Sequence, residues 1–394
     1  MLSGRLDHSY TPEVRRAINP ITAAKVGANS AYRFAPPFLA TIASGLHTSL
    51  TTMAAALAVG ELAGLSAPLL GRVAARVTHR AAICGGLLGI GATATGCALS
   101  RNVVQLGVWL ALLTMTKIVF DVGVVAWISD RVPYVQRGRV IGLSETAWAG
   151  GLFIGVVAMG LVTGLTSWRW GYAVAVVAVT ALAALLRQRL PEEAKPGRIE
   201  PAADHVKPRL GQGWWVIIAT VTLTGSAQAV FVTFGKWLKD GFGFSDIDLA
   251  LVIFALGGVE LLAASTMIRY SDRWGKQRSA MVGAAMIVPC AAGLAVSSNH
   301  VAIALPILAV YIGAFEFAII SALPLASNLV PTNPSQGLGM MIGAGTLGRA
   351  TMAAPAAAAF VNHGMWLPAT IGGTCAGATV LAHWRYRVSP DSHS

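Results

Sequence analysis

The chain has few charged residues for its length. Only 12% of its 394 residues are Asp, Glu, Lys or Arg, whereas 55% are hydrophobic, and its mean hydropathy is +0.63. Soluble globular domains contain about a quarter charged residues, because these cover the surface that faces water. The shortage therefore excludes an ordinary water-soluble protein and predicts that lipid covers most of the surface.

The motifs of several function classes are also lacking. The sequence contains no GxxxxGK[ST] phosphate loop, which excludes an ATP-driven pump within this chain. Its eight histidines are scattered over loops, tails and span ends, so we expect no metal site and no membrane enzyme. The four cysteines lie in apolar runs and form no CxxC, so they indicate neither a disulfide nor a metal site.

Apolar runs fill most of the chain. A membrane-spanning helix needs about 20 mostly apolar residues. Twelve segments meet this requirement. They lie at 26–46, 50–70, 81–99, 103–128, 139–165, 169–186, 213–237, 247–268, 279–297, 301–327, 337–362 and 367–385. The sequence predicts an all-α integral membrane protein with 12 transmembrane helices.

The distribution of Lys and Arg predicts the orientation of these spans. If the N-terminus lies inside, most of the 29 Lys and Arg fall in inner segments. The outer segments then hold only four, Arg101, Arg169, Lys236 and Lys239. Because inner loops of membrane proteins are enriched in Lys and Arg, both termini should be cytoplasmic. The net charge of +12 follows from this bias, and we expect no nucleic-acid partner.

A polar, proline-rich segment divides the chain in two. It begins at Arg187 and reads RQRLPEEAKPGRIEPAADHVKPRLG. Such a composition is typical of a linker. We therefore expect a first six-helix bundle at 1–186, a cytoplasmic linker at 187–212, and a second six-helix bundle with a short cytoplasmic tail at 213–394. Residues 1–25 are polar and lack the apolar core of a secretory signal, so they should form a cytoplasmic tail.

Two charged loops repeat between the halves. GRVAARVTHR starts at Gly71 and RYSDRWGKQR starts at Arg269, and each follows the second span of its half. Arg76 and Arg273 in these loops are half the chain length apart. A repeat of this kind predicts two pseudo-symmetric bundles.

The loops resemble the G-x-x-x-D-R/K-x-G-R/K-R/K signature of the major facilitator superfamily. The second copy matches its core, with Gln277 in the last basic position and Arg278 one residue later. The matching residues are Asp272, Arg273, Gly275 and Lys276. The first copy keeps Gly71, Arg76 and Arg80 but has Ala75 where the family has its acid.

The fifth span resembles a more specific pattern. Gly151, Gly155 and Gly160 match g-x-x-x-G-P-x-x-G-G of drug:proton antiporters and sugar-efflux permeases, with Val156 in place of the proline. Glycines at this spacing also let helix backbones approach closely, whatever the function. Lys117 lies where the family's fourth helix often has Arg.

The resemblance implies a secondary transporter that works by alternating access, with the two loops latching the inner side. Its partners would be a small-molecule substrate, protons and the lipid bilayer. The proton gradient would supply the energy, without a cofactor, and the protein would lie in the cytoplasmic (inner) membrane. We expect a monomer.

Eight ionisable residues fall inside the predicted spans. Each costs about 2.5–3.5 kcal/mol or more near the bilayer centre, so each should face a cavity or a partner. They are Arg33, Glu61, Lys117, Asp121, Glu145, Glu260, Glu316 and Arg349. Asn29 and Gln228 are further polar residues that could line a path. Pro36–Pro37 and Pro324 should break the backbone hydrogen bonding of the first and tenth spans.

Depth along the helices suggests which of these charges meet. Arg33 and Glu61 should lie at similar levels, as a structural ion pair or as part of a substrate or proton site. Lys117 and Asp121 are four residues apart and share a helix face. Glu145 should lie near Asp121, where either acid could complete an inner gate with the loop arginines. Glu260, Glu316 and Arg349 should lie near the midplane.

Five acids against three bases within the spans favour proton coupling or cationic substrates. By resemblance, we expect efflux of a drug-like, sugar or other small amphipathic compound. Proton-coupled uptake, lipid-type transport by the same fold, and a non-transporting receptor or scaffold remain as alternatives.

Overall fold

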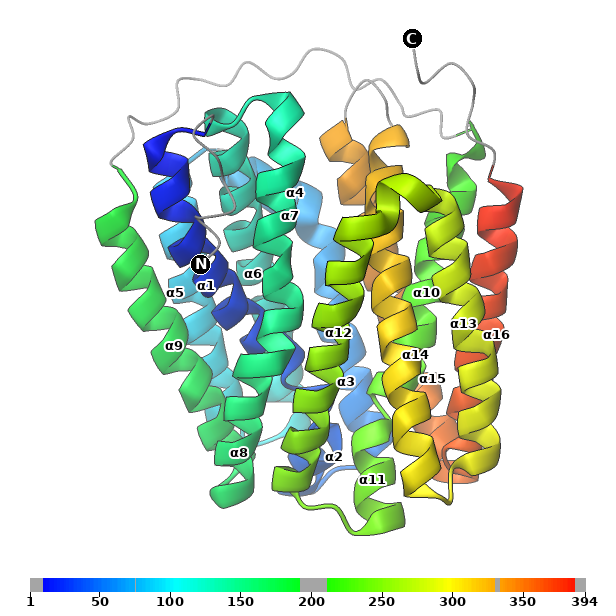
Figure 1. Ribbon diagram of the computed structural model, residues 1–394. Helices are drawn as coiled ribbons and strands as arrows, with labels where there is room; N and C mark the ends of the chain where they lie inside the picture. Colours follow the sequence, from blue (N-terminus) through cyan, green and yellow to red (C-terminus); the bar gives the residue numbers. More distant parts are fainter. Residues whose placement is uncertain (1–9, 75, 192–210, 330–333, 387–394) are drawn as a thin grey trace. The chain divides into compact units, whose positions relative to one another are not determined.

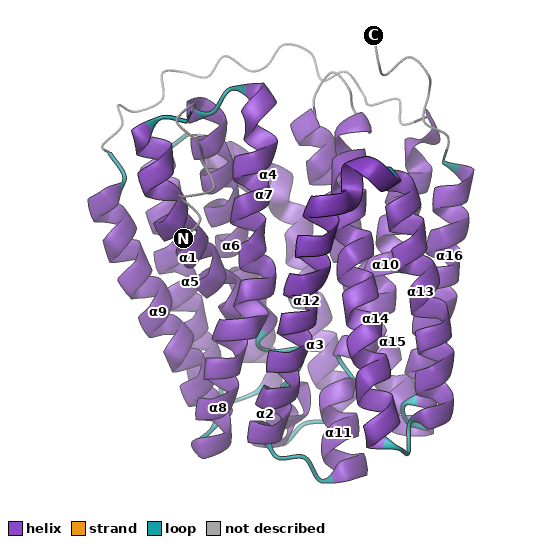
Figure 2. Cartoon of the chain, viewed as in Figure 1, coloured by secondary structure: helices purple, strands orange, loops and turns teal. Residues whose placement is uncertain are grey.

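The computed structural model describes residues 10–74, 76–191, 211–329 and 334–386. It does not describe the side chains at 134–139, 141–142, 268–273, 326–328 and 334–336. Within the described part, all regular structure is helical and no strand occurs (Figure 2). The predicted all-α membrane fold is confirmed to this extent.

The chain divides into two compact units. Unit 1 comprises Met1–Ala35, Ser66–Ala203 and Asp246–Gly257. Unit 2 comprises Pro36–Leu65, Asp204–Ser245 and Gly258–Ser394. Each unit thus contains segments from both halves of the sequence. The predicted boundary at 187–212 falls largely outside the described residues and stays a prediction.

Unit 1 is built around α5, which packs against α6 and α9 (Figure 1). Helix α1 contacts α7, α9 and a π-helical turn, η3, that joins α7 to α8. The bounds are α1 Pro12–Arg33, α4 Ala67–Ala74, α5 His79–Leu99, α6 Val103–Arg131, α7 Tyr134–Gly150, η3 Gly151–Val156, α8 Val157–Leu165 and α9 Trp168–Arg189.

Unit 2 is built around α10, which packs against α15 and α16. Helix α13 contacts α14 and α16, and α3 lies along α15. The bounds are α2 Leu39–Gly45, α3 Leu50–Leu62, α10 Trp214–Phe231, α11 Phe234–Phe242, α13 Lys276–Ser297, α14 Val301–Ala322, α15 Pro334–His363 and α16 Trp366–Arg385. Helix α12, Asp246–Trp274, has residues in both units. Short 3₁₀ turns complete the set: η2 Ala63–Ser66, η4 Gly211–Gly213 and η5 Leu323–Asn328.

Prolines break the helices where the sequence predicts. The first span, predicted as 26–46, is two helices, because α1 ends at Arg33 and α2 begins only after Pro36–Pro37. Helix α1 also begins much earlier than expected, within the predicted polar tail, where Thr11 Oγ1 accepts a hydrogen bond of 3.4 Å from the Val14 amide. At Pro324, the chain changes from α14 to the 3₁₀ turn η5.

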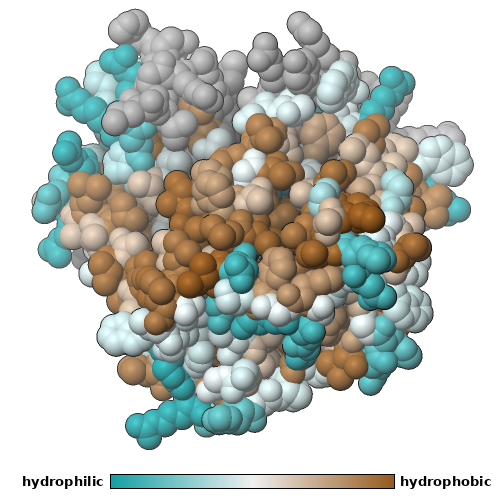
Figure 3. Space-filling model, turned by 60° about the horizontal axis from the view of Figure 1, so that its bottom comes forward, coloured by the Kyte–Doolittle hydropathy of each residue, from teal (hydrophilic) through white to brown (hydrophobic). Residues whose placement is uncertain are grey.

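Nine segments of the described chain are long and apolar enough to cross a bilayer. They correspond to the second to tenth predicted spans, and they are 50–74, 79–99, 103–131, 143–165, 168–189, 211–242, 246–267, 276–297 and 301–325. Helices α15 and α16, of 30 and 20 residues, are not among these nine segments. The count of twelve spans therefore stays a prediction. Figure 3 shows wide areas of apolar side chains on the visible face, with some hydrophilic side chains among them and others toward its edges.

Glycines let the helices of each unit approach closely. A Cβ atom on Gly86 of α5 would lie 2.7 Å from the backbone of Phe120 on α6. A Cβ on Gly64, at the end of α3, would lie 2.6 Å from Thr346 Cγ2 of α15. Close backbone approach increases van der Waals contact, which is the main source of helix association in lipid.

The neighbouring glycines of α5 offer a test of this packing. A Cβ on Gly86 meets the α6 backbone, whereas a Cβ on Gly85 has no atom within 4 Å. We expect Gly86→Val to destabilise the protein by about 1–3 kcal/mol or more, because the backbone of α6 must move. Gly85→Val should stay within about 0.5 kcal/mol of the parent. Thermal unfolding in detergent measures both, and equal melting temperatures for the two variants would contradict the proposed α5–α6 contact.

Candidate functional site

Charged side chains form pairs within otherwise apolar helices. Unit 1 contains a group of charged and aromatic side chains on α1, α6 and α7, here called the α1–α6–α7 cluster. Unit 2 contains an ion pair between α3 and α15, together with buried acids on α12 and α14. These groups include all eight ionisable residues predicted from the sequence and add one, Lys25.

The first pair of the α1–α6–α7 cluster joins α1 to α7. Lys25 Nζ donates a hydrogen bond of 2.5 Å to Glu145 Oε1. The lysine side chain is only 4% exposed, whereas that of Glu145 is 43% exposed. Asp121 of α6 also acts electrostatically on Lys25. The buried ammonium group of Lys25 is thus stabilised by its contact with Glu145 and by the negative charge of Asp121.

The second pair lies within α6. Lys117 Nζ lies 2.5 Å from Asp121 Oδ2, one helical turn away, as the spacing of four residues suggests. The same ammonium group lies 5.4 Å from the centre of the Tyr32 ring and 5.9 Å from that of Trp148. A cation this close to aromatic faces is stabilised by the negative charge of the ring faces.

Arg33 lies against the same tryptophan. Its guanidinium carbon is 4.5 Å from the centre of the Trp148 ring, and its Nη1 donates a hydrogen bond of 2.9 Å to the Trp148 carbonyl. A deviation from regular hydrogen bonding follows at once, because α7 passes into the π-helical turn Gly151–Val156. Such turns are frequent at functional sites.

The glycines of that turn bring α1 and α7 together. A Cβ on Gly151 would lie 2.7 Å from Cβ of Asn29, which is buried, and a Cβ on Gly155 would overlap Ser30 Oγ. The Ser30 hydroxyl donates to the Gly151 carbonyl at 3.2 Å. Gly160, further along, is buried in α8. Gly151 and Gly155 therefore set the distance between α1 and the turn η3 that follows α7.

In unit 2, an ion pair joins α3 to α15. Arg349 Nε donates a hydrogen bond of 2.9 Å to Glu61 Oε2. The Glu61 side chain is 5% exposed and that of Arg349 is 26% exposed. The two residues come from opposite halves of the sequence, so this bond joins the first predicted bundle to the second. The predicted contact of Glu61 with Arg33 involves residues of different units and stays a prediction.

Further polar side chains of unit 2 are buried. Glu260 on α12 and Glu316 on α14 are 0% and 2% exposed. Gln228 on α10 is also buried, and its Nε2 has no hydrogen-bond partner among the described residues. A Cβ atom on Gly313 of α14 would lie 2.6 Å from Cγ1 of Val259 on α12. Val259 precedes Glu260, and Gly313 lies one turn before Glu316. The two acids therefore lie on helices that touch at their level.

Comparison with known proteins identifies the family. The sequence profile of the Major Facilitator Superfamily matches residues 24–357, which is most of the chain. The chain belongs to this superfamily. It is thus a multi-pass integral membrane transporter and not an enzyme.

Individual relatives are distant. A curated relative, the uncharacterized MFS-type transporter YwfA of Bacillus subtilis (strain 168), is 23% identical over 261 residues. That match spans 64% of this chain and only 63% of the relative, which is less than two thirds of its length.

Solved structures share the fold. A bacterial homolog of the human lysosomal transporter Spinster has a TM-score of 0.74 at 11% identity, covering 96% of this chain and 99% of its own. The human organic anion transporter MFSD10 (TETRAN) has a TM-score of 0.65 at 14% identity, with 96% and 100% covered. At these identities the likeness shows the fold alone. It supports the superfamily and leaves the predicted drug:proton antiporter and sugar-efflux branch as a hypothesis.

The first superfamily loop is tied to two helix ends of unit 1. Arg80 Nη2 donates a hydrogen bond of 2.6 Å to the carbonyl of Arg187 at the end of α9. His79 Nε2 lies 3.4 Å from Asp130 Oδ2 near the end of α6. Arg76 is exposed, and Gly71 lies in α4. The acids predicted to complete this gate, Asp121 and Glu145, are found with Lys117 and Lys25.

The second loop makes a similar contact in unit 2. Gln277 Nε2 donates to the carbonyls of His383 and Tyr386 at the end of α16, at 2.6 and 2.7 Å. Gly275 has φ +77°, a conformation that favours glycine, at the start of α13. Lys276 and Arg278 are exposed. The side chains of Asp272 and Arg273 lie outside the described residues.

Sequence reasoning missed Lys25, Tyr32 and the contact of Glu61 with Arg349. Lys25 lies in the predicted cytoplasmic tail, because the apolar run that defines the first predicted span starts at residue 26. A signal was present, since Lys25, Asn29 and Arg33 follow one another at four-residue spacing and share one helix face. Among the described residues, no group of three His, Cys, Asp or Glu could hold a metal ion.

The Lys25–Glu145 pair gives a test of the cluster. Glu145→Gln leaves a nearly buried ammonium without this counterion, so we expect a loss of about 1–3 kcal/mol in stability. Adding Lys25→Met should restore part of that loss. Thermal unfolding in detergent measures both variants.

The control for this test is an exposed pair. Lys236 Nζ lies 2.7 Å from Asp240 Oδ2, with side chains 32% and 56% exposed. Because exposed pairs contribute only about 0–1 kcal/mol, Asp240→Asn should change little. If Glu145→Gln were as harmless as Asp240→Asn, Lys25 would not depend on this carboxylate.

Proposed function

We propose that this protein exports a small amphipathic compound across the cytoplasmic membrane in exchange for protons. The observation that supports this most is the Glu61–Arg349 ion pair, a titratable bond between the two halves of the sequence within apolar helices. Alternating access requires that contacts between the halves form and break in each cycle.

Protonation of Glu61 would change the strength of this bond. When Glu61 is ionised, its attraction to Arg349 holds α3 against α15. When it is neutral, the Coulomb attraction is lost and only a hydrogen bond remains. In this proposal the substrate also contacts the guanidinium of Arg349, whose side chain is 26% exposed. A proton taken up by Glu61 would thus loosen α3 from α15, which couples proton uptake to movement.

Glu260 and Glu316 are the other carboxyl groups that could bind the transported proton. Both are almost completely buried on touching helices. Burial disfavours the charged form of a carboxyl group, and a nearby cation favours it. A change of surroundings during the cycle would therefore bind or release a proton at such a group.

The α1–α6–α7 cluster provides a binding surface of mixed character. Tyr32 and Trp148 present aromatic rings, 6.3 Å apart between centres. Lys117 and Arg33 lie over these rings, and the carboxylates of Asp121 and Glu145 are partly exposed. A compound with an apolar body and at least one charge would find complementary groups here, which is why we propose an amphipathic substrate.

An organic anion is the second candidate. Lys25, Arg33 and Lys117 place three cations in the cluster beside two aromatic rings. A related fold, MFSD10, is named as an organic anion transporter. A thermal-shift panel of amphipathic cations, organic anions and sugars separates the two candidates, because a ligand stabilises the protein that it binds. Stabilisation by anions alone would favour the second candidate.

The transport assay uses proteoliposomes with an imposed pH gradient. We expect Glu61→Gln to reduce gradient-driven accumulation of the best panel compound about tenfold or more, since its side chain cannot bind and release a proton. Exchange of labelled for unlabelled compound without a gradient should persist, because it needs no net proton movement. Asp240→Asn, in the exposed pair of α11, is the control and should transport as the parent does.

Two results would overturn the proposal. If Glu61→Gln and Asp240→Asn both accumulate the compound like the parent, Glu61 takes no part in coupling. If the parent itself accumulates nothing across the panel under a pH gradient in either direction, proton-coupled export is wrong.

A further inference from the structure

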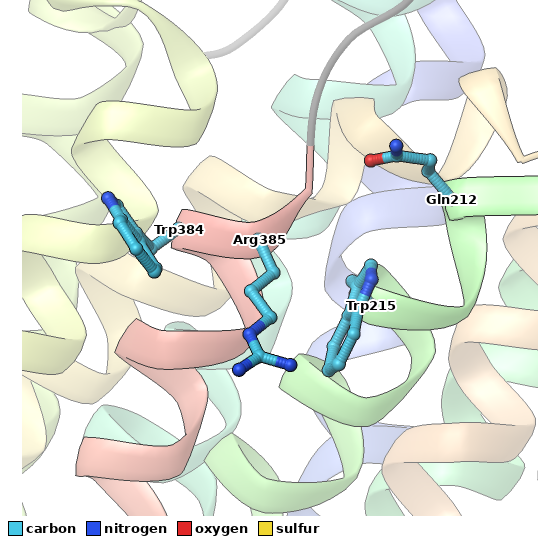
Figure 4. Close-up of a pocket in the computed structure, with 4 residues that line it drawn as sticks. All are labelled: Gln212, Trp215, Trp384 and Arg385. Atoms are coloured by element: carbon cyan, nitrogen blue, oxygen red, sulfur yellow. The ribbon is translucent and has the colours of Figure 1, made fainter.

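We infer that the junction of α10 and α16 in unit 2 is a binding site for the phosphate headgroup of an anionic phospholipid. The structure has a cavity of about 420 Å³ there, lined by Gln212, Trp215, Trp384 and Arg385 (Figure 4). This site is separate from the ion pairs described above and does not depend on the proposed transport reaction.

The lining residues favour an anion. Arg385 supplies a positive charge, Gln212 an amide, and the two tryptophans supply indole N–H donors, while none of the four is acidic. Figure 4 shows the Arg385 side chain extended toward Trp215, and its guanidinium carbon lies 5.3 Å from the centre of that ring. Stacking on the ring leaves the edge of the guanidinium able to donate hydrogen bonds, the geometry in which arginine binds phosphate.

The position of the cavity favours a lipid over a soluble anion. Trp384 and the neighbouring Trp214 are 68% and 57% exposed, and exposed tryptophans are typical of the membrane–water interface. The cavity also lies at the start of α10, which in the sequence directly follows the segment 187–212 with its six Lys and Arg. Basic pockets between transmembrane helices on the cytoplasmic side are suited to anionic headgroups.

Apolar surface continues from the cavity along both helices. Leu381 lies one turn before Arg385 on α16 and is 62% exposed. Ile218 lies one turn after Trp215 on α10 and is 40% exposed. Residues at these spacings share a helix face, and α10 and α16 are in contact. A headgroup in the cavity could therefore extend its acyl chains along these side chains, which a free phosphate ion would not use.

The α16 side of the cavity is held in place from α13. The hydrogen bonds from Gln277 to the carbonyls of His383 and Tyr386 bracket Trp384 and Arg385. Tyr386 itself packs in a buried cluster with Val216, and Trp215 packs against that cluster. The site is thus a formed feature of the fold, and Gln277 is a positioning residue for it.

Lipid binding can be measured by native mass spectrometry of the delipidated full-length protein in detergent. We expect the parent to bind one dioleoylphosphatidylglycerol at a concentration about tenfold lower than that needed for dioleoylphosphatidylcholine. A tenfold difference in affinity corresponds to the free energy of about one hydrogen bond to a charged group. Arg385→Gln should abolish this preference, and Arg385→Lys should keep part of it. Gln277→Leu should weaken it.

Arg189→Gln is the matched control. Arg189 is also an exposed arginine in the last turn of the last helix before a polar segment, on α9 of unit 1. It should keep the full preference for phosphatidylglycerol. Melting temperatures in detergent, which should be equal for Arg385→Gln and Arg189→Gln, show that both variants are folded.

Three outcomes would overturn the inference. If the parent and Arg385→Gln prefer phosphatidylglycerol equally, Arg385 does not bind the headgroup. Loss of preference in Arg189→Gln as well would indicate general charge attraction and no specific site. Displacement of phosphatidylglycerol from the parent by millimolar inorganic phosphate would show a site for free phosphate, because a bound lipid also gains from its acyl chains.

Discussion

The absence of water from the hydrocarbon layer is the constraint on which this structure depends. Backbone groups and charges in that layer must find partners within the protein. The described spans are accordingly helical, and six of their charges form three ion pairs. Where prolines interrupt a helix, at Pro36–Pro37 and Pro324, the chain resumes as a new helix or a 3₁₀ turn. Because lipid provides no hydrophobic attraction between helices, close contact at glycines such as Gly86 and Gly64 takes its place.

The ion pairs share an asymmetry that relates this constraint to transport. In each pair, one partner is nearly buried and the other is more exposed: Lys25 with Glu145, Lys117 with Asp121, and Glu61 with Arg349. Removing one partner of a buried pair is costly, because the other charge is then left without its counterion, whereas a pair exposed on both sides contributes little. In the proposed transport cycle, the more exposed partner exchanges this bond for one to a proton or substrate, and the buried charge is then satisfied in another way.

The sequence predicts the helices better than it predicts their partners. Hydropathy places most spans well because each span is judged on its own residues, and the proline breaks follow from local chemistry. The predicted spans at 337–362 and 367–385 also coincide with α15 and α16. Depth along the helices places Glu61 and Arg33 at similar levels, but many helices pass the same level. Only the folded chain shows that α15 lies beside α3 and brings Arg349 to Glu61.

The two superfamily loops show that a repeat can keep a contact while its residues change. Arg80 and Gln277 stand four residues after Arg76 and Arg273, and each donates to the carbonyls that end the last helix of its half. Carbonyls at a helix end carry partial negative charge and favour a cation. In the first half Arg80 supplies that cation. In the second half the neutral amide of Gln277 satisfies two carbonyls, and the positive charge comes from Arg385 of α16 itself. The departure from the signature at Gln277 therefore leaves the end of α16 capped, while the Arg385 guanidinium lies over Trp215 at the edge of a cavity.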